Sequence, residues 1–321
     1  MPLNILSLSE VGPAAGDTGK PPVPRDGWDR PLVVPEEGGS PIALTRMTTH
    51  VNVLEDKSNL ERYAKRNVLR GASVMDWREL QNVRRLDPND PRDKRELNRI
   101  ADRAEHLSGA NEKRQHGTHL HDLSEYVDRG EPLPPHASDT DMRDMAAYAL
   151  ATSMLQQVYI ETLVVCRDLK ASGTPDRVSF YDGLDPDGCL AGNMITDLKT
   201  GSVEYGELKM AMQLAGYSRG RFYDHTLFPL PAHDPNDEKA RKAAVAAFKK
   251  QSFAEEQARA AYTPLPDVNQ NWGLIINLPA GTGTCTVYWI DLRVGWAAAN
   301  LATQVREARK HKVLVPFGVS V

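Results

Sequence analysis

Hydrophobic residues along the chain change their spacing near residue 158. Before this point they recur every three or four positions, as in 58–71 and 139–150, and this period predicts amphipathic helices. Ser138 and Asp141 fit a capping box at the start of the second of these helices. From 158 to 166, apolar and β-branched residues follow one another directly, which predicts a strand.

The second half of the chain alternates strands and helices. We expect a strand that ends at Lys199, a helix over 205–217, and a hairpin formed by 272–278 and 284–292. A last helix should follow, with an inward face that includes Val294. This order indicates the α/β (α+β) class, with a central mixed sheet flanked by helices and a helical N-terminal part.

Three segments are expected from the composition along the chain. Residues 1–40 are rich in proline, glycine and charge, so we expect a flexible N-terminal arm that buries no core. Residues 41–135 should form the helical N-terminal part, and residues 136–321 the core. Within the core, 232–262 is a charged helical insertion, which we interpret as a solvated helix or helix pair rather than a lid or DNA clamp.

Composition and charge exclude some classes of protein. The chain has 321 residues and a net charge of −4, which argues against a protein that coats nucleic acid but leaves room for a local basic groove. Its three cysteines have no CxxC spacing, which indicates a reducing compartment with free thiols. There is no long apolar run and no signal-like N-terminus, so we expect a soluble, cytoplasmic protein with no membrane partner.

The strand that ends at Lys199 carries the first candidate site. Asp197 and Lys199 are two positions apart, so both side chains should leave the same face of the strand. Asp176 can join them from a neighbouring strand. Two carboxylates and a lysine favour metal-dependent hydrolysis with Mg²⁺ or Mn²⁺. The alternative is a solvated strand end, with Asp176 in a turn and paired with Arg177.

Other polar residues could complete this site. His121 competes with His116 and His119 for the role of an imidazole ligand. Glu125 lies one helical turn after His121 and is either its partner or a solvated acid. Glu161 is flanked by apolar residues, and it points either outward at an edge or inward at the site.

Gln213 and Tyr217 lie one turn apart on the helix predicted over 205–217. They are either a partly buried amphipathic pair or residues that hold the lysine or a DNA backbone beside the metal.

Four motifs in order give the chain a family resemblance. They are Gly117–His121, Gly173–Asp176, Asp197–Lys199 and Gln213–Tyr217, which fit Gly-x-x-x-His, Gly-x-x-Asp, Asp-x-Lys and Gln-x-x-x-Tyr. With them the chain resembles the RecB-like branch of the PD-(D/E)xK nucleases, and most closely the RecB-like exonucleases of actinobacterial phages. The resemblance covers roughly 42–310.

The resemblance implies a restriction-endonuclease-like sheet and a defined set of site residues. It implies metal ligands at His121, Asp176 and Asp197 and at the main-chain carbonyl of Leu198, catalysis by Lys199, Asp197 and Asp176, and supporting or DNA-binding roles for Glu161, Gln213, Tyr217 and Arg177. Many relatives hold an iron–sulfur cluster on four cysteines, and the three cysteines here predict none. No nucleotide cofactor is expected, because the chain has no Gly-x-x-x-x-Gly-Lys-Ser/Thr loop.

We therefore expect a Mg²⁺- or Mn²⁺-dependent deoxyribonuclease, an exonuclease that acts on phage or bacterial DNA in replication, recombination or repair. Its partner would be single- or double-stranded DNA, with recombination or replication proteins as further candidates. The alternative is a nucleic-acid-binding or virion-associated protein that keeps the fold and has lost catalysis. A metal hydrolase with a substrate other than nucleic acid is a third, weaker hypothesis.

Overall fold

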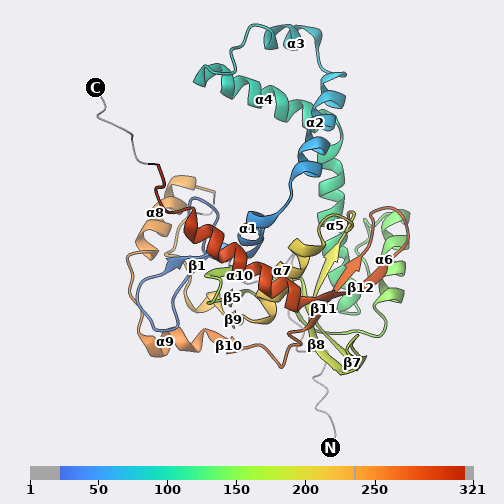
Figure 1. The fold of residues 1–321 in the computed structure, drawn as a ribbon, viewed down its shortest axis with the longest axis vertical. Helices are drawn as coiled ribbons and strands as arrows, with labels where there is room; N and C mark the ends of the chain where they lie inside the picture. The colour runs from blue at the N-terminus through green and yellow to red at the C-terminus, as the bar shows by residue number, and fades with distance from the viewer. Residues whose placement is uncertain (1–21, 235, 315–321) are drawn as a thin grey trace, which may run out of the picture. The chain divides into compact units, whose positions relative to one another are not determined.

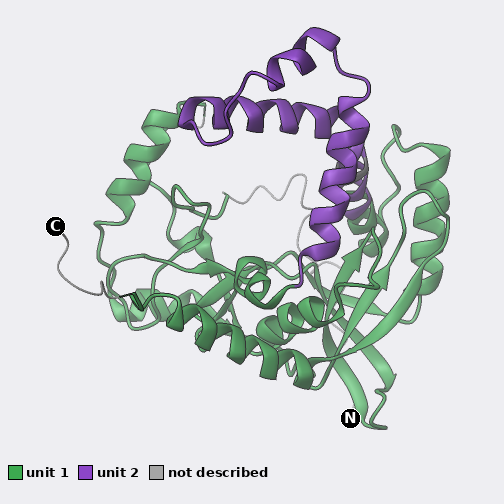
Figure 2. Ribbon diagram, turned by 45° about the horizontal axis from the view of Figure 1, so that its top comes forward, with its two compact units in different colours: residues 1–55, 122–321 green, residues 56–121 purple. Residues whose placement is uncertain are grey.

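The computed structural model describes residues 22–234 and 236–314. The chain divides into two compact units, which are coloured separately in Figure 2. The smaller unit comprises residues 56–121, and the larger comprises residues 1–55 and 122–321. The division thus falls inside the segment 41–135 that was expected to form one helical part.

The smaller unit is helical. Its elements are α2 (Ser58–Ala72), α3 (Trp77–Val83), α4 (Pro91–Leu107) and the first part of α5 (Ala110–Asp128). Helices α2 and α4 pack against each other around a small apolar core that includes Met75 and Ile100.

The larger unit contains a five-stranded mixed sheet in the order β12-β11-β8-β7-β4 (Figure 1). Its strands are β4 (Gln156–Ile160), β7 (Arg177–Leu184), β8 (Leu190–Lys199), β11 (Trp272–Asn277) and β12 (Thr286–Asp291). β8 and β11 are parallel, and the other neighbouring strands are antiparallel. The predicted mixed α/β class, the hairpin and the strand end at Lys199 are confirmed.

A second sheet of five short strands has the order β10-β9-β5-β6-β3. These are β3 (Thr45–Arg46), β5 (Val164–Cys166), β6 (Ala171–Gly173), β9 (Arg221–Tyr223) and β10 (Tyr262–Pro264). β1 (Leu32–Val33) and β2 (Ile42–Ala43) form a separate antiparallel pair.

Helices complete the larger unit. They are α1 (Met47–Val51), α6 (Asp139–Ala151), α7 (Glu207–Ser218), α8 (Glu238–Phe248), α9 (Glu255–Ala260) and α10 (Leu292–Ala308), with the short 3₁₀ turns η2 (Asn52–Leu54) and η3 (His225–Leu227). α7 and α10 pack side by side, and the main apolar core lies between them, α1 and the sheets. The capping box of Ser138 and Asp141 is confirmed at the start of α6. Among the described residues, none of the helices combines the length and the apolar content that crossing a bilayer requires.

The expectation of a flexible arm over 1–40 is wrong for residues 22–40, and residues 1–21 lie outside the described part. Leu32, Val33 and Val34 are at most 1% exposed. The Val34 N–H donates to Tyr223 Oη, and the Val34 carbonyl accepts from Tyr262 Oη. This segment buries its apolar run against residues about 190 to 230 positions later, which a local composition cannot indicate.

Two other expectations need correction. The 232–262 segment does form two helices, but they are not simply solvated, because Val245 and Phe248 pack in the same apolar cluster as Leu32. On α10, Val294 is 57% exposed, and the buried side of the helix includes Ala299 instead. Gly295 allows α10 to approach α7 closely, because a Cβ at this position would lie 2.2 Å from the main-chain oxygen of Ala211.

Candidate active site

Two acids and a lysine meet at the end of β8. Asp197 and Lys199 leave the same face of this strand. β7 begins one residue after Asp176 and pairs antiparallel with β8, which places Asp176 beside Asp197. The Leu198 N–H donates to Asp176 Oδ2 at 2.8 Å. The structure thus brings together the three residues that were predicted to share a site.

Asp197 and Lys199 form an ion pair. Asp197 is 2% exposed, whereas the Lys199 side chain is 32% exposed. Desolvation, followed by the charge of Asp176, raises the pKa of Asp197 to about 6, although Lys199 acts in the opposite direction. Burial disfavours the Lys199 ammonium, but Asp197 and Asp176 outweigh it, and the pKa of Lys199 is raised. One lysine therefore faces two carboxylates.

Glu161 breaks the strand predicted over 158–166. Its φ of 47° lies in the left-handed region, and the chain forms β4 before it and β5 after it instead of one strand. Its N–H donates to the main-chain oxygen of Asp176 at 3.1 Å. Desolvation, and then the charges of Asp176 and Glu125, raise the pKa of Glu161 to about 7. Glu161 is nevertheless exposed to solvent, so it is not a buried member of the acidic site, although the charges of Asp176 and Glu125 act on it.

Gln213 and Tyr217 are buried on α7, at 9% and 2% exposed. The Gln213 Nε2–H donates to Tyr217 Oη at 3.4 Å. Burial, and then the charge of Asp197, raise the pKa of Tyr217, so its hydroxyl keeps its proton beside the acids. Buried side chains offer no surface to a DNA backbone, so the structure favours a supporting role for both residues.

Gly173, at the end of β6, leaves the space that Tyr217 occupies. A Cβ added to Gly173 would lie 2.7 Å from Tyr217 Oη and 3.3 Å from Met47 Cβ. The glycine of the Gly173–Asp176 motif therefore has a packing reason, since any side chain would push Tyr217 away from the acids.

Arg177 is 2% exposed and is held by helices of its own unit. Its guanidinium forms an ion pair with Asp128, donates to Ser124 Oγ at 2.5 Å, and lies 5.5 Å from the centre of the Tyr148 ring. Tyr148 Oη also donates to Asp128 Oδ1 at 2.7 Å. Arg177 thus ties β7, directly after Asp176, to α5 and α6, which is a supporting role and not a DNA contact.

Sequence reasoning missed the partners of Arg177. Ser124 and Asp128 are four residues apart on α5, so they lie on one face of the helix. The sequence feature that could have indicated these partners is the position of the polar pair next to the apolar residue Leu123, which is 1% exposed.

His121 is half-buried on α5 and is the last residue of the 56–121 unit. The acids belong to the other unit, and ligation by His121 therefore stays a prediction. Glu125 belongs to the unit of the acids, is 3% exposed and pairs with Arg129 at 3.1 Å. The alternative that Glu125 is a solvated acid is wrong.

The donor set at the end of β8 fits a hard divalent cation. Asp197 Oδ2 is buried, and its polar partner among the described residues is the Lys199 ammonium. Asp176 lies alongside, and the main-chain carbonyl of Leu198, the residue after Asp197, is a neutral oxygen next to these acids in the chain. Mg²⁺ and Mn²⁺ prefer such oxygen ligands, and a cation would relieve the repulsion that raises the pKa of Asp197.

No protein-family profile matches the chain, and no curated protein matches its sequence. The functional argument therefore rests on the site itself. Two adjacent carboxylates can hold a divalent cation, and a lysine beside them can donate to a water or to an oxygen that gains negative charge.

Proposed function

We propose that this chain is a Mg²⁺- or Mn²⁺-dependent DNA nuclease that acts as an exonuclease, with a restriction-endonuclease-like mixed sheet. One observation carries the proposal: Asp176, Asp197 and Lys199 meet at the end of β8, where Asp197 is buried next to a second carboxylate. The four motifs of the RecB-like resemblance support it, since Gly173, Gln213 and Tyr217 each have a structural role around these acids.

In this mechanism Asp176, Asp197 and the Leu198 carbonyl would hold the cation, which supplies Lewis acidity to a phosphodiester oxygen and to water. Lys199 would orient the attacking water and offset the negative charge that develops on the phosphate. Tyr217, kept protonated by burial, and Gln213 would hold the wall of the site next to Asp197. Arg177 would keep the start of β7 in place through Asp128.

Cleavage of end-labelled DNA tests the proposal. Linear single- and double-stranded DNA and a closed circle would be incubated with Mn²⁺, Mg²⁺ or chelator. We expect metal-dependent loss of the linear DNA and an intact circle for the wild type, and no cleavage by Lys199→Ala. The matched control is Lys249→Ala, because Lys249 has a similar exposure of 38% and also faces a carboxylate, Asp26, at 3.9 Å.

Three outcomes of this assay would count against the proposal. Normal cleavage by Lys199→Ala would remove Lys199 from the mechanism. Cleavage of the closed circle would show that the protein does not act as an exonuclease, because a circle has no ends. DNA that is bound but not cleaved with either metal would instead support the nucleic-acid-binding protein without catalysis.

A further inference from the structure

The charges of this chain are segregated between its two units. Residues 56–121 contain 15 lysines and arginines and 11 aspartates and glutamates, a net charge of +4. The remainder of the chain contains 24 basic and 32 acidic residues, a net charge of −8. An acidic catalytic unit has to approach a polyanion if the proposed function is right, so the position of the positive charge matters.

Helix α2 arranges part of this charge as a stripe. Arg62, Arg66 and Arg70 follow one another at four-residue intervals and therefore share one face of the helix. All three are exposed. Val68 and Ala72 pack towards α4 from the opposite side of α2. The arginine stripe thus points away from the core of its unit.

The arginines of the stripe differ from those of α4. Arg99 pairs with Glu96 at 2.7 Å, and both Arg99 and Arg103 face Glu79, at 3.7 and 3.6 Å. Among the described residues, no carboxylate lies within ion-pair distance of the three stripe arginines, and the nearest acidic influence is Asp56, on whose carboxylate the charge of Arg62 acts at longer range. The acidic residue of α2, Glu61, is exposed and lies seven residues before Val68, so it shares the helix side of Val68 and not that of the stripe. The stripe is therefore a row of guanidinium groups available to an external anion.

The dimensions of the stripe suit a nucleic-acid strand. A helix rises about 1.5 Å per residue, so eight residues span about 12 Å. Phosphates of one strand of duplex DNA are spaced about 3.4 Å along the axis, so this span covers between three and four of them. Arginine also donates to phosphate with two parallel N–H groups. Tyr63 flanks the stripe and is 42% exposed, which offers a ring for stacking against a base.

We propose that the arginine stripe of α2 is a binding site for the phosphate backbone of DNA, and that the 56–121 unit supplies the chain's hold on its substrate. This inference rests on the proposed function for the identity of the polyanion. It assigns substrate binding and catalysis to different units: the stripe binds backbone without reading sequence, and the acids of β8 carry out hydrolysis.

Fluorescence anisotropy of labelled DNA with the full-length protein tests the stripe. The variant Arg62→Gln/Arg66→Gln/Arg70→Gln is measured in a Lys199→Ala background with chelator, so that cleavage does not interfere. We expect binding about ten- to a hundredfold weaker than that of the background. The slope of log K against log salt should fall by roughly 2 to 3, because each phosphate contact contributes about 0.7 to 0.9.

The control variant removes the same charge from the other unit. Arg241→Gln/Arg259→Gln/Lys310→Gln removes three basic residues that each pair with a carboxylate three or four residues away. We expect its affinity and salt slope to stay within about twofold and about 0.5 of the background. Circular dichroism and the melting temperature verify that both variants fold.

The possible results separate this inference from the proposed function. If the stripe variant keeps the affinity and salt slope of its background, or if the control loses as much as the stripe variant, the stripe is not the DNA site. If the stripe variant loses affinity while the wild type cleaves no DNA with any metal, the inference stands and the nuclease assignment fails.

Discussion

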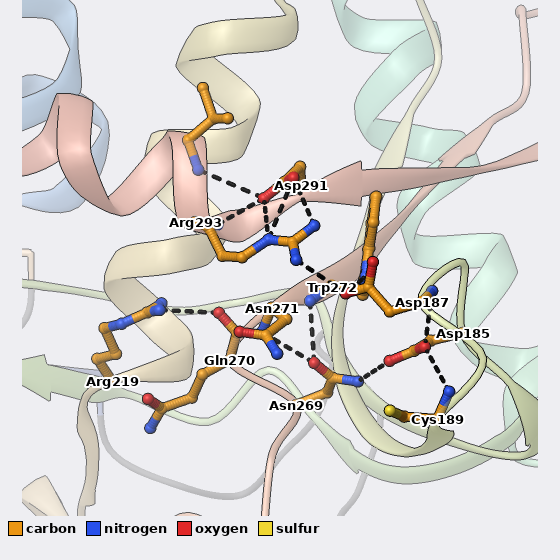
Figure 3. Close-up of polar contacts among 11 residues, drawn as sticks. Asp185, Asp187, Cys189, Arg219, Asn269, Gln270, Asn271, Trp272, Asp291 and Arg293 are labelled. Atoms are coloured by element: carbon orange, nitrogen blue, oxygen red, sulfur yellow. Dashed lines mark hydrogen bonds and ion pairs between the residues drawn. The ribbon is translucent and has the colours of Figure 1, made fainter.

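Acidic residues lie near both ends of strand β8, and the two groups of carboxylates differ in the hydrogen bonds and ion pairs that they receive. At the N-terminal end, Asp185 Oδ1 accepts hydrogen bonds from the N–H groups of Asp187 and Cys189, both at 3.0 Å, and Asp185 Oδ2 accepts one from Asn269 at 3.2 Å (Figure 3). Asp187 Oδ2 accepts from Trp272 Nε1 at 2.9 Å and pairs with Arg293 at 2.8 Å. Asp185 and Asp187 therefore both have donors aimed at them.

At the C-terminal end, Asp197 is buried beside Asp176, and the positive charge next to Asp197 comes from Lys199. Asp176 accepts the Leu198 N–H, Asp197 pairs with Lys199, and the buried guanidinium of Arg177 is paired with Asp128. The pKa values follow this difference. Desolvation acts to raise the pKa of Asp185, but hydrogen bonds from Cys189 and Asn269 outweigh it and lower that pKa.

The comparison shows that the supply of donors, and not acidity alone, separates a structural acid from a candidate ligand. Hydrogen bonds satisfy the turn at Asp185 within the chain. At the end of β8, Lys199 does not offset the desolvation of Asp197 and the charge of Asp176, and together these raise the pKa of Asp197 to about 6.

Neutralising one acid at each end of β8 should give the largest difference in DNA cleavage. Asp176→Asn should lower cleavage of linear DNA by at least about 10³-fold, because it removes a proposed cation ligand. Asp187→Asn should change cleavage by less than about twofold, since its partners Trp272 and Arg293 are remote from the reaction. A similar loss of cleavage in both variants would show that the acids at the two ends of β8 do not differ in function.

Replacing the arginine near each end of β8, Arg177 or Arg293, should have different effects on the free energy of unfolding. Arg177→Met leaves Asp128 buried without its guanidinium and should cost about 3–5 kcal/mol in the free energy of unfolding. Arg293→Met should change the free energy of unfolding far less, because Arg293 is 45% exposed and its ion pairs are at the surface. Urea denaturation measures both values. The double variant Arg177→Met/Asp128→Leu should recover much of the loss, and no recovery would contradict the assigned pair.

The two ends should also change stability with pH in opposite directions, and this is the smallest effect. The raised pKa of Asp197 means that its ionisation costs stability as pH rises from about 4 to about 6. The lowered pKa of Asp185 means that its ionisation stabilises the fold above about pH 4, and this is lost as pH falls further.

Melting temperatures in chelator, for wild type, Asp197→Asn and Asp185→Asn, measure this pH dependence. Relative to Asp197→Asn, the wild type should lose stability as pH rises through 4 to 6. Relative to Asp185→Asn, it should gain stability as pH rises towards about 4. Equal slopes for the two variants would show that the environments of the two acids do not differ as described.

Local signals in the sequence predicted the parts of the fold that depend on neighbours in the chain. The capping box at Ser138, the hairpin of β11 and β12, and the end of β8 at Lys199 each follow from a few adjacent residues. The alternation along β8 was sufficient to place Asp197 and Lys199 on one face, and the structure adds Asp176 beside them.

The parts that were missed depend on distant contacts or on one backbone angle. Leu32 is buried because residues far along the chain cover it, among them Phe248 of a segment expected to be solvated. Glu161 adopts a positive φ, which no strand propensity indicates. The sequence did not separate a supporting from a DNA-binding role for Arg177, because its partner Asp128 is 49 residues away on another element.

Titration with Mn²⁺ distinguishes the two ends of β8, because we propose a cation site at Asp176 and Asp197 and none at Asp185. Calorimetric or paramagnetic-resonance titrations would compare the wild type with Asp197→Asn and Asp185→Asn. We expect Asp197→Asn to weaken Mn²⁺ binding at least about tenfold and Asp185→Asn to leave it unchanged. Equal binding by the wild type and Asp197→Asn, or loss of binding only in Asp185→Asn, would contradict this expectation.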